Sequence, residues 1–376
     1  MGQGEFRKAV MDAMRYFTGP LSVALSGVVF AGFWGLSADS GADRQTVVRL
    51  ERIQTFEGFH KGSFASDNKL LTLVNISHAD LVEARSGRKL KRFDQPNSSF
   101  LSAVLSPDGR SLATANKTVE TANSTLIEIT LWDVSSGHKN FTLPAPDSDW
   151  RRPVDDLSFS PDGRLLASSV GGVARLWDVN SGKEVRRFPA PADQSGLEAE
   201  RALLSPDGRL MAAYFSSVQQ GINSLVQITE LASGNQRAFA TEIYSDWRFS
   251  ADSRFLAVTA IADKGKPAEH SVVEIWGVGS ARRVKTIEVP PEWRGAYAIA
   301  FSPDSKLIAV GGYKKFGIFE VDTDRWLVSE THHRPSFLQD SEMPNQVNHV
   351  EFSPDSSLLL SAGNDSTVKV WSVTRQ

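Results

Sequence analysis

The sequence contains no cysteine, so a disulfide framework, a thiolate nucleophile and a cysteine-ligated zinc site are excluded. It also lacks an excess of basic residues, because 41 lysines and arginines face 44 acidic residues and the formal net charge is −3. Nucleic-acid-binding domains are generally basic. The charge balance therefore predicts no nucleic-acid partner.

Recognisable catalytic motifs are absent as well. The chain has seven histidines, and the only adjacent pair is His332 and His333. Neighbouring residues on a strand point to opposite sides, which disfavours one metal ion bound by both. The sequence has no serine nucleophile elbow, no HExxH zinc motif and no phosphate-binding loop. We therefore expect no metal, no cofactor and no catalytic residues, and we expect that the protein is not an enzyme.

What the chain does contain is a unit, from Leu157 to Phe188, of short strands joined by explicit turns. Ser160 to Gly163 form the first turn, in which proline presets its own φ and glycine takes the exit. Apolar and polar residues alternate with the period of a strand and not of a helix. The expected strands are 157–159, 165–169, 174–179 and 184–188. One such sheet cannot bury both of its faces alone, so the unit requires neighbours.

The rest of the chain repeats this unit, which is typical of a repeat architecture. The first turn is marked by a serine in seven places, at Ser66, Ser106, Ser160, Ser205, Ser250, Ser302 and Ser353. Each turn is followed by a strand that ends in a Trp-Asp-like box. The boxes are LVEARSG, LWDVSSG, LWDVNSG, ITELASG, IWGVGSA, IFEVDTD and VWSVTRQ.

In these motifs the sequence resembles the WD-repeat family of β-propellers, in the bacterial version marked by FSPDG and LWDV. The resemblance extends over residues 47–376 and implies an all-β, seven-bladed propeller of four-stranded antiparallel blades. The last copy stops near Val373 without an outer strand, and residues 47–56 read like the missing strand. The resemblance implies that 47–56 pair with 367–373, which removes the unpaired edges of an open stack.

The chain departs from the family in one respect. The Gly-His signature that usually precedes each repeat is missing. Its absence argues against the buried hydrogen bond between histidine and aspartate that braces the blades of eukaryotic members.

Two further segments precede the repeats. Residues 1–18 place apolar side chains at intervals of three and four and predict an amphipathic helix. Residues 19–38 carry no charge and as a helix would span about 30 Å, the thickness of a membrane core. We interpret them as a transmembrane helix; a cleaved signal peptide and a helix packed on soluble protein are the alternatives. Gly27, Ala31 and Gly35 would share one helical face and favour close packing, in a dimer or against a membrane subunit.

Residues 39–46 form a polar linker, and the propeller follows at 47–376. Basic residues on the two sides of the uncharged segment nearly balance, with a slight bias toward a cytoplasmic N-terminus. We therefore expect a single-pass protein of a bacterial inner membrane with its propeller in the periplasm.

Loops give such a ring its binding surface, because the strands serve as scaffold. In the resembled family, the loops leading into each innermost strand and those between the second and third strands open on one face. Here these loops place aromatic residues beside cations, a combination typical of protein contact surfaces. The residues predicted to bind a partner are Trp150, Arg151, Arg152, Trp293, Arg294, Tyr313, His333, Arg334 and Phe337.

These features favour a membrane-anchored scaffold that binds a protein partner, itself associated with the membrane. The alternative is a periplasmic propeller enzyme or small-ligand sensor that uses the central channel. Loop tips rich in His, Asp and Glu around the channel would favour the alternative.

Overall fold

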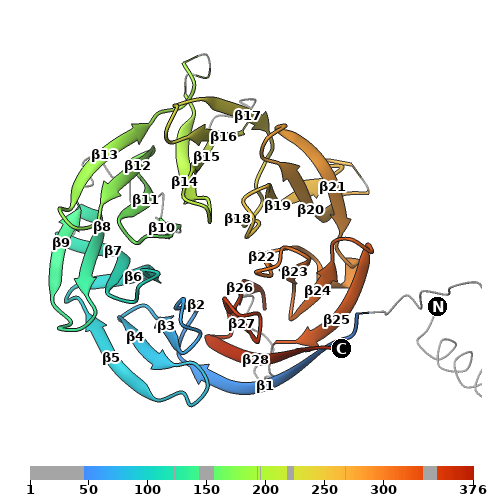
Figure 1. The fold of residues 1–376 in the computed structure, drawn as a ribbon, viewed down its shortest axis with the longest axis horizontal. Coiled ribbons are helices and arrows are strands. Elements are labelled where there is room, and N and C mark those ends of the chain that lie inside the picture. The colour runs from blue at the N-terminus through green and yellow to red at the C-terminus, as the bar shows by residue number, and fades with distance from the viewer. Residues whose placement is uncertain are drawn as a thin grey trace, which may run out of the picture. The chain divides into compact units, whose positions relative to one another are not determined.

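The repeats form a ring of seven blades around a central channel, as the computed structural model shows (Figure 1). The structure describes residues 46–121, 124–143, 156–192, 194, 196–217, 224–266, 268–332 and 345–376. Each blade is a four-stranded antiparallel sheet, numbered in chain order from blade 1 (β2–β5) to blade 7 (β26–β28 with β1). The predicted all-β, seven-bladed fold is confirmed.

Within each blade the strands run outward from the channel. The innermost strands are β2 (Lys61–Phe64), β6 (Ser98–Leu105), β10 (Leu157–Phe159), β14 (Glu198–Leu204), β18 (Trp247–Phe249), β22 (Ala298–Phe301) and β26 (Val347–Phe352). The second strands are β3 (Leu70–Val74), β7 (Ser111–Thr121), β11 (Leu165–Val170), β15 (Leu210–Ser216), β19 (Phe255–Ala262), β23 (Leu307–Gly311) and β27 (Leu358–Gly363). The third strands are β4 (His78–Glu83), β8 (Ser124–Asp133), β12 (Val173–Asp178), β16 (Leu225–Glu230), β20 (His270–Gly277), β24 (Lys315–Glu320) and β28 (Thr367–Arg375). The outer strands are β5 (Lys89–Asp94), β9 (Lys139–Leu143), β13 (Lys183–Phe188), β17 (Gln236–Ala240), β21 (Arg282–Glu288), β25 (Arg325–Thr331) and β1 (Val48–Glu57).

The recurring serine fixes the first turn of the blade. Ser160 Oγ donates a hydrogen bond to Asp162 Oδ1 at 2.6 Å and accepts one from the Leu165 backbone N–H at 2.9 Å. The same pair of bonds forms at Ser106, Ser205, Ser250, Ser302 and Ser353. Blade 1 differs from the prediction, because Ala65 rather than Ser66 takes the position whose backbone N–H closes the turn, bonding to Leu70 O at 2.9 Å.

The ring closes through strands from opposite ends of the repeats. β1 pairs antiparallel with β28, from Val48 opposite Arg375 to Glu57 opposite Thr367, with one irregularity between Arg52 and Gln54. In Figure 1 the blue β1 follows the outer edge of the red β28. The predicted pairing of 47–56 with 367–373 is confirmed, and it supplies the outer strand that blade 7 otherwise lacks.

The apolar core is divided into seven clusters, each between two adjacent blades. Blades 5 and 6, for example, bury Ile275, Ile299 and Phe319 in one cluster. Partly buried Ile53 and Phe56 of β1 pack on the cluster between blades 7 and 1. Closure therefore buries apolar surface in addition to pairing backbone groups.

Blade 7 contains a buried histidine brace that the missing Gly-His signature argued against. His332 is fully buried, with Nδ1 2.8 Å from Ser361 Oγ and Nε2 3.4 Å from Asp365 Oδ1. Trp371 Nε1 donates to the same Ser361 Oγ at 2.8 Å. The expectation is therefore wrong for this blade, because His332 reaches the site without a preceding glycine.

The N-terminal predictions lie outside this description. The predicted amphipathic helix, the predicted membrane helix with Gly27, Ala31 and Gly35, and most of the linker fall within residues 1–45, which are not among the described residues. Within the described part of the chain, no helix has the length and apolar character needed to cross a membrane.

Deleting residues 47–56 tests the closure. The loss of Leu50, Ile53 and Phe56 from the core, together with the exposed edge of β28, should lower the free energy of unfolding by on the order of 5 kcal/mol. Thermal melts followed by circular dichroism, with gel filtration to detect aggregation, measure the effect. An unchanged melting temperature and a monomeric elution profile would contradict the account.

Candidate functional site

Two regions of the ring concentrate polar and aromatic side chains. We call the side that carries the loops preceding the innermost strands the loop face, and the side that carries the serine turns the turn face. The first region is a pocket on the loop face between blades 5 and 6. The second is the central channel.

The loop-face pocket has a volume of about 550 Å³. The residues that line it come from three loops, at 242–244, 261–271 and 289–295. All three belong to the loops that the sequence analysis predicted to open on this face. Ile243, Val289 and the prolines at 290 and 291 supply apolar surface, and Tyr244 beside them is 50% exposed. Charged residues complete the lining: Glu242, Lys264, Glu269, His270 and Arg294.

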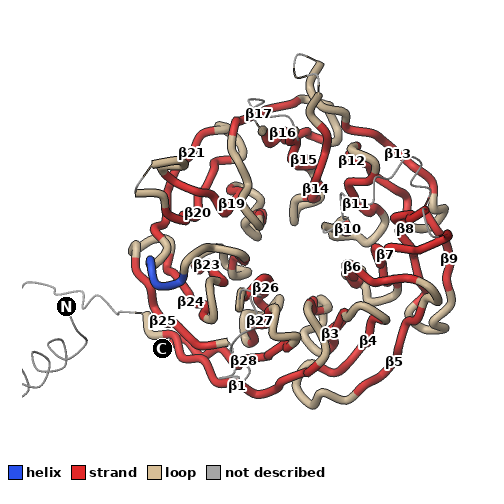
Figure 2. The backbone as a smooth tube through the Cα atoms, turned by 180° about the vertical axis from the view of Figure 1, so that it is seen from behind, coloured by secondary structure: helices blue, strands red, loops and turns tan. Residues whose placement is uncertain are grey.

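A buried tryptophan shapes one wall of this pocket. The short helix η1 (Pro291–Trp293), drawn blue in Figure 2, places Trp293 against Trp326 with ring centroids 4.8 Å apart. A Cβ at Gly317 would lie 2.6 Å from the Trp293 ring, so glycine leaves the room for it. Trp293 is 2% exposed. Its predicted role as a contact residue is therefore wrong, since its side chain packs in the core.

Arg294 and Tyr313, which were both predicted as contact residues, come together on the loop face. The backbone of Arg294 ends η1 in the left-handed region, with φ 51°, which turns its exposed side chain away from buried Trp293. Its guanidinium carbon lies 5.1 Å from the centroid of the Tyr313 ring, a cation–π contact. Lys314 Nζ lies 5.2 Å from the same ring.

Two further tyrosines extend this surface. Tyr244 and Tyr297 lie with ring centroids 5.9 Å apart, and the Tyr297 hydroxyl donates to Arg294 O at 3.1 Å. Burial and the neighbouring Tyr244 raise the pKa of Tyr297, so its hydroxyl stays protonated at neutral pH. We call Tyr244, Tyr297, Tyr313 and Arg294 the tyrosine patch. It holds three of the chain's five tyrosines, and the sequence analysis missed Tyr244 and Tyr297 although both lie in loops that precede innermost strands.

The other predicted contact residues are not placed. Trp150, Arg151, Arg152, His333, Arg334 and Phe337 lie outside the described residues, and their role stays a prediction.

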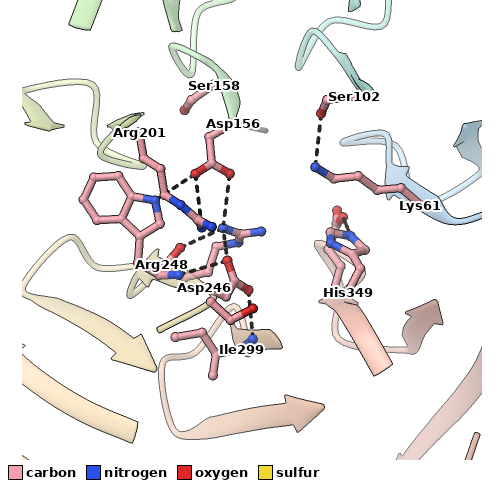
Figure 3. Close-up of polar contacts among 12 residues, drawn as sticks. Lys61, Ser102, Asp156, Ser158, Arg201, Asp246, Arg248, Ile299 and His349 are labelled. Carbon is pink, nitrogen blue, oxygen red and sulfur yellow. Dashed lines mark hydrogen bonds and ion pairs between the residues drawn. The ribbon is translucent and has the colours of Figure 1, made fainter. Parts of the chain in front are cut away.

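The central channel is lined by charged residues of several blades (Figure 3). A cavity of about 240 Å³ opens at the channel's loop-face end, and one of about 320 Å³ lies beside the innermost strands. Lys61, Asp156, Arg248 and His349 line both. Within the described ranges, no group of three or more His, Asp or Glu side chains is placed to hold a metal ion.

Asp156 is the centre of the charged lining. Its Oδ2 accepts a hydrogen bond from Trp247 Nε1 at 2.9 Å and lies 3.7 Å from Arg201 Nη1, while Oδ1 lies 3.8 Å from Arg248 Nη1. Asp156 directly precedes β10 of blade 3 and its partners belong to blades 4 and 5, so one carboxylate links three blades. Burial alone would raise the pKa of Asp156, but the charges of Arg201, Arg248 and Lys61 and the Trp247 hydrogen bond hold it below its ordinary value.

A second carboxylate continues the chain of contacts into blade 6. Asp246 Oδ1 forms an ion pair with Arg248 Nη1 at 2.7 Å, and Oδ2 accepts a hydrogen bond from the Ile299 backbone N–H at 2.9 Å. Burial lowers the pKa of Arg248, but Asp246 and Asp156 outweigh it, so the pKa is raised and the guanidinium stays charged.

The opposite wall of the channel is built by blades 1, 2 and 7. Lys61 Nζ donates to Ser102 Oγ at 3.1 Å. Glu351 Oε1 accepts a bond from the Phe64 backbone N–H at 3.0 Å, and Oε2 lies 3.4 Å from His349 Nε2. Burial and the charge of Lys61 lower the pKa of His60 beside it, so this imidazole is neutral at pH 7.

Comparison with known proteins agrees with this geometry. A family profile for the WD domain, G-beta repeat, matches residues 137–178 and 338–372. These stretches run from β9 to β12 and into β28, so each ends in the third strand of a four-stranded blade. The two matched stretches are similar to WD repeats, and the fold that contains them is a seven-bladed β-propeller. A comparison with curated protein sequences found no match.

Several blades share one tryptophan contact. Trp132 Nε1 donates to Thr114 Oγ1 and Trp177 Nε1 donates to Ser168 Oγ, both at 2.9 Å, as Trp371 does to Ser361. WD repeats generally mediate contacts between proteins. These three tryptophans are buried, so their side chains are not available for such contacts.

The stability of the channel lining should depend on pH through Asp156. Because its folded-state pKa lies below the unfolded value of about 3.9, the carboxylate stabilises the fold above that pH, and the stabilisation is lost as the pH falls through the folded-state pKa. We expect Asp156→Asn to cost roughly 3 kcal/mol at pH 7 and less at pH 3. Urea unfolding of both proteins at the two pH values measures this.

Asp94→Asn at the exposed end of β5 is the control for the loss of any carboxylate. A cost of Asp156→Asn that is the same at pH 7 and pH 3 would contradict the assignment.

Proposed function

We propose that this WD-repeat propeller is a protein-interaction scaffold that holds a protein partner on its loop face and is anchored to a membrane by residues 19–38. The tyrosine patch, beside a pocket of about 550 Å³, is the observation that carries the proposal. Tyrosine and arginine are the side chains that most often anchor protein interfaces, because they offer large area at low entropic cost.

Hydrogen bonds connect the loops of the patch to one another. The Tyr313 backbone N–H donates to Trp293 O at 2.7 Å, and the Trp293 side chain is packed in the core. Ser245 Oγ, next to Tyr244, donates to Tyr297 O at 2.8 Å and joins blade 5 to blade 6. These bonds favour binding, because a loop that is already held in place loses less freedom when a partner binds.

The membrane anchor rests on sequence alone. The segment 19–38 is uncharged, and the linker 39–46 would let the propeller lie at most about 28 Å from it. In the proposal the propeller lies on the periplasmic side of a bacterial inner membrane, and Gly27, Ala31 and Gly35 pack the helix against a second one.

Protease treatment of intact cells tests the side of the membrane. Degradation of the propeller only after the inner membrane is opened would reject the periplasmic location.

The loop-face assignment is tested with the variant Tyr244→Ala/Arg294→Ala/Tyr313→Ala in the full chain. Crosslinked detergent extracts of membranes should yield at least about 30-fold less partner than wild type, since loss of each anchor costs about 2 kcal/mol at a hot spot. Quantitative mass spectrometry of the co-purified proteins measures the loss.

Matched surface changes away from the patch serve as controls. Arg209→Ala on the turn face and Val284→Ala on the outer strand β21 alter exposed residues and should leave capture unchanged. The loop-face assignment is wrong if the triple variant captures the same partner as well as these controls do.

Deletion of 19–38 should move the folded propeller to the soluble fraction. Retention of the propeller in membranes would reject the anchor.

A further inference from the structure

The charged lining of the channel is unusual because the fold does not require it. Asp156 is 7% and Asp246 6% exposed, and Arg201 and Arg248 have side chains that are 20% and 26% exposed. Burying charges is costly, and replacing a buried ion pair with well-packed apolar residues is often neutral or stabilising. The apolar clusters between blades already hold the ring together. The lining therefore points to a ligand.

The two carboxylates of the lining already have N–H groups and guanidinium groups as partners. Asp246 accepts hydrogen bonds from the Trp247 and Ile299 backbone N–H groups, both at 2.9 Å, and forms an ion pair with Arg248. Asp156 accepts the Trp247 indole N–H and faces two guanidinium groups. A cationic ligand would have to compete with these partners, so the lining does not favour one.

The guanidinium groups of Arg201 and Arg248, in contrast, have N–H donors that are not used in hydrogen bonds with the described residues. Each has five N–H groups. Arg248 Nη1 donates a hydrogen bond to Trp247 O and forms an ion pair with Asp246, both at 2.7 Å. The ion pairs of Arg201 and Arg248 with Asp156, at 3.7 and 3.8 Å, are too long for hydrogen bonds. Among the residues that the structure describes, the other N–H groups of these two arginines have no acceptor, and both side chains line the cavity of about 240 Å³.

We propose that this cavity binds a small molecule with a carboxylate or phosphate group, held by Arg201 and Arg248 with Lys61 facing them. Of the described residues lining the cavity, Lys61, Arg201 and Arg248 outnumber the carboxylates Asp156 and Asp246, and this positive excess favours an anionic ligand. Asp156 is a positioning residue, because its contacts hold the two guanidinium groups side by side (Figure 3).

The size of the cavity limits the ligand. A water molecule occupies about 30 Å³ in the liquid, so about 240 Å³ accommodates on the order of eight non-hydrogen atoms. A small dicarboxylate or inorganic phosphate fits this volume, whereas a folded protein segment does not. The site adjoins the tyrosine patch at Tyr297, which lines the cavity, but it does not depend on the proposed partner.

Isothermal titration calorimetry of the full-length protein at pH 7 tests the proposal, with succinate and inorganic phosphate as separate probes at constant ionic strength. We expect saturable binding of at least one probe with a dissociation constant in the millimolar range or below. Arg201→Lys and Arg248→Lys should each weaken it at least tenfold, because lysine keeps the positive charge beside Asp156 but loses the planar fork that binds oxyanions. Circular dichroism verifies that these charge-conserving variants fold.

Arg209→Lys, an exposed arginine on the turn face, is the matched control and should bind like wild type. The preference between the probes tells whether the group is a carboxylate or a phosphate. Absence of saturable binding of both probes, or equal affinity in Arg201→Lys, Arg248→Lys and Arg209→Lys, would overturn the proposal. The variant Tyr244→Ala/Arg294→Ala/Tyr313→Ala leaves every residue that lines the cavity unchanged, Tyr297 included, and should still bind the probe, so a failed partner assay leaves this result interpretable.

Discussion

The pairing of β1 with β28 is the constraint on which the rest of the structure depends. A row of four-stranded sheets buries its apolar faces only between neighbours, and an open row leaves two terminal faces and a free strand edge. By giving blade 7 its outer strand, β1 places Ile53 and Phe56 against blade 1 and completes the seventh inter-blade cluster. Every site described above requires this closure, because each draws residues from at least two blades.

Closure creates two environments with different chemistry. On the loop face, segments of blades 5 and 6 place Tyr244 beside Tyr297 and Arg294 beside Tyr313, next to a pocket with apolar and charged walls. In the channel, Asp156 of blade 3 reaches Trp247 and Arg248 of blade 5. The first surface suits a protein, since it offers exposed aromatic area on loops of two blades. The second suits a small anion, since it is rich in guanidinium donors.

Local chemistry made much of the fold predictable. The Ser-Pro-Asp-Gly turns, the alternation at 157–188 and the strand-like 47–56 depend on residues close in sequence, and they predicted the strands and turns of the repeated unit. The resemblance to the WD-repeat family implied the ring of seven blades and its closure. Burial was harder to predict, because an aromatic residue beside arginine is typical of both a contact surface and a core. Trp293 proved to be core only because Gly317, on another strand, leaves room for its ring. The channel lining could not be predicted at all, since Asp156 and Arg248 meet only across the closed ring.

The most direct measurement of the central claim, that the loop face binds the protein partner, is site-specific photo-crosslinking in intact cells. A photoreactive amino acid replaces Tyr244 in one protein and Arg209, on the turn face, in another. The account predicts one dominant crosslinked protein from position 244 and none of that species from position 209. Crosslinking of the same protein from position 209, with none from position 244, would contradict it.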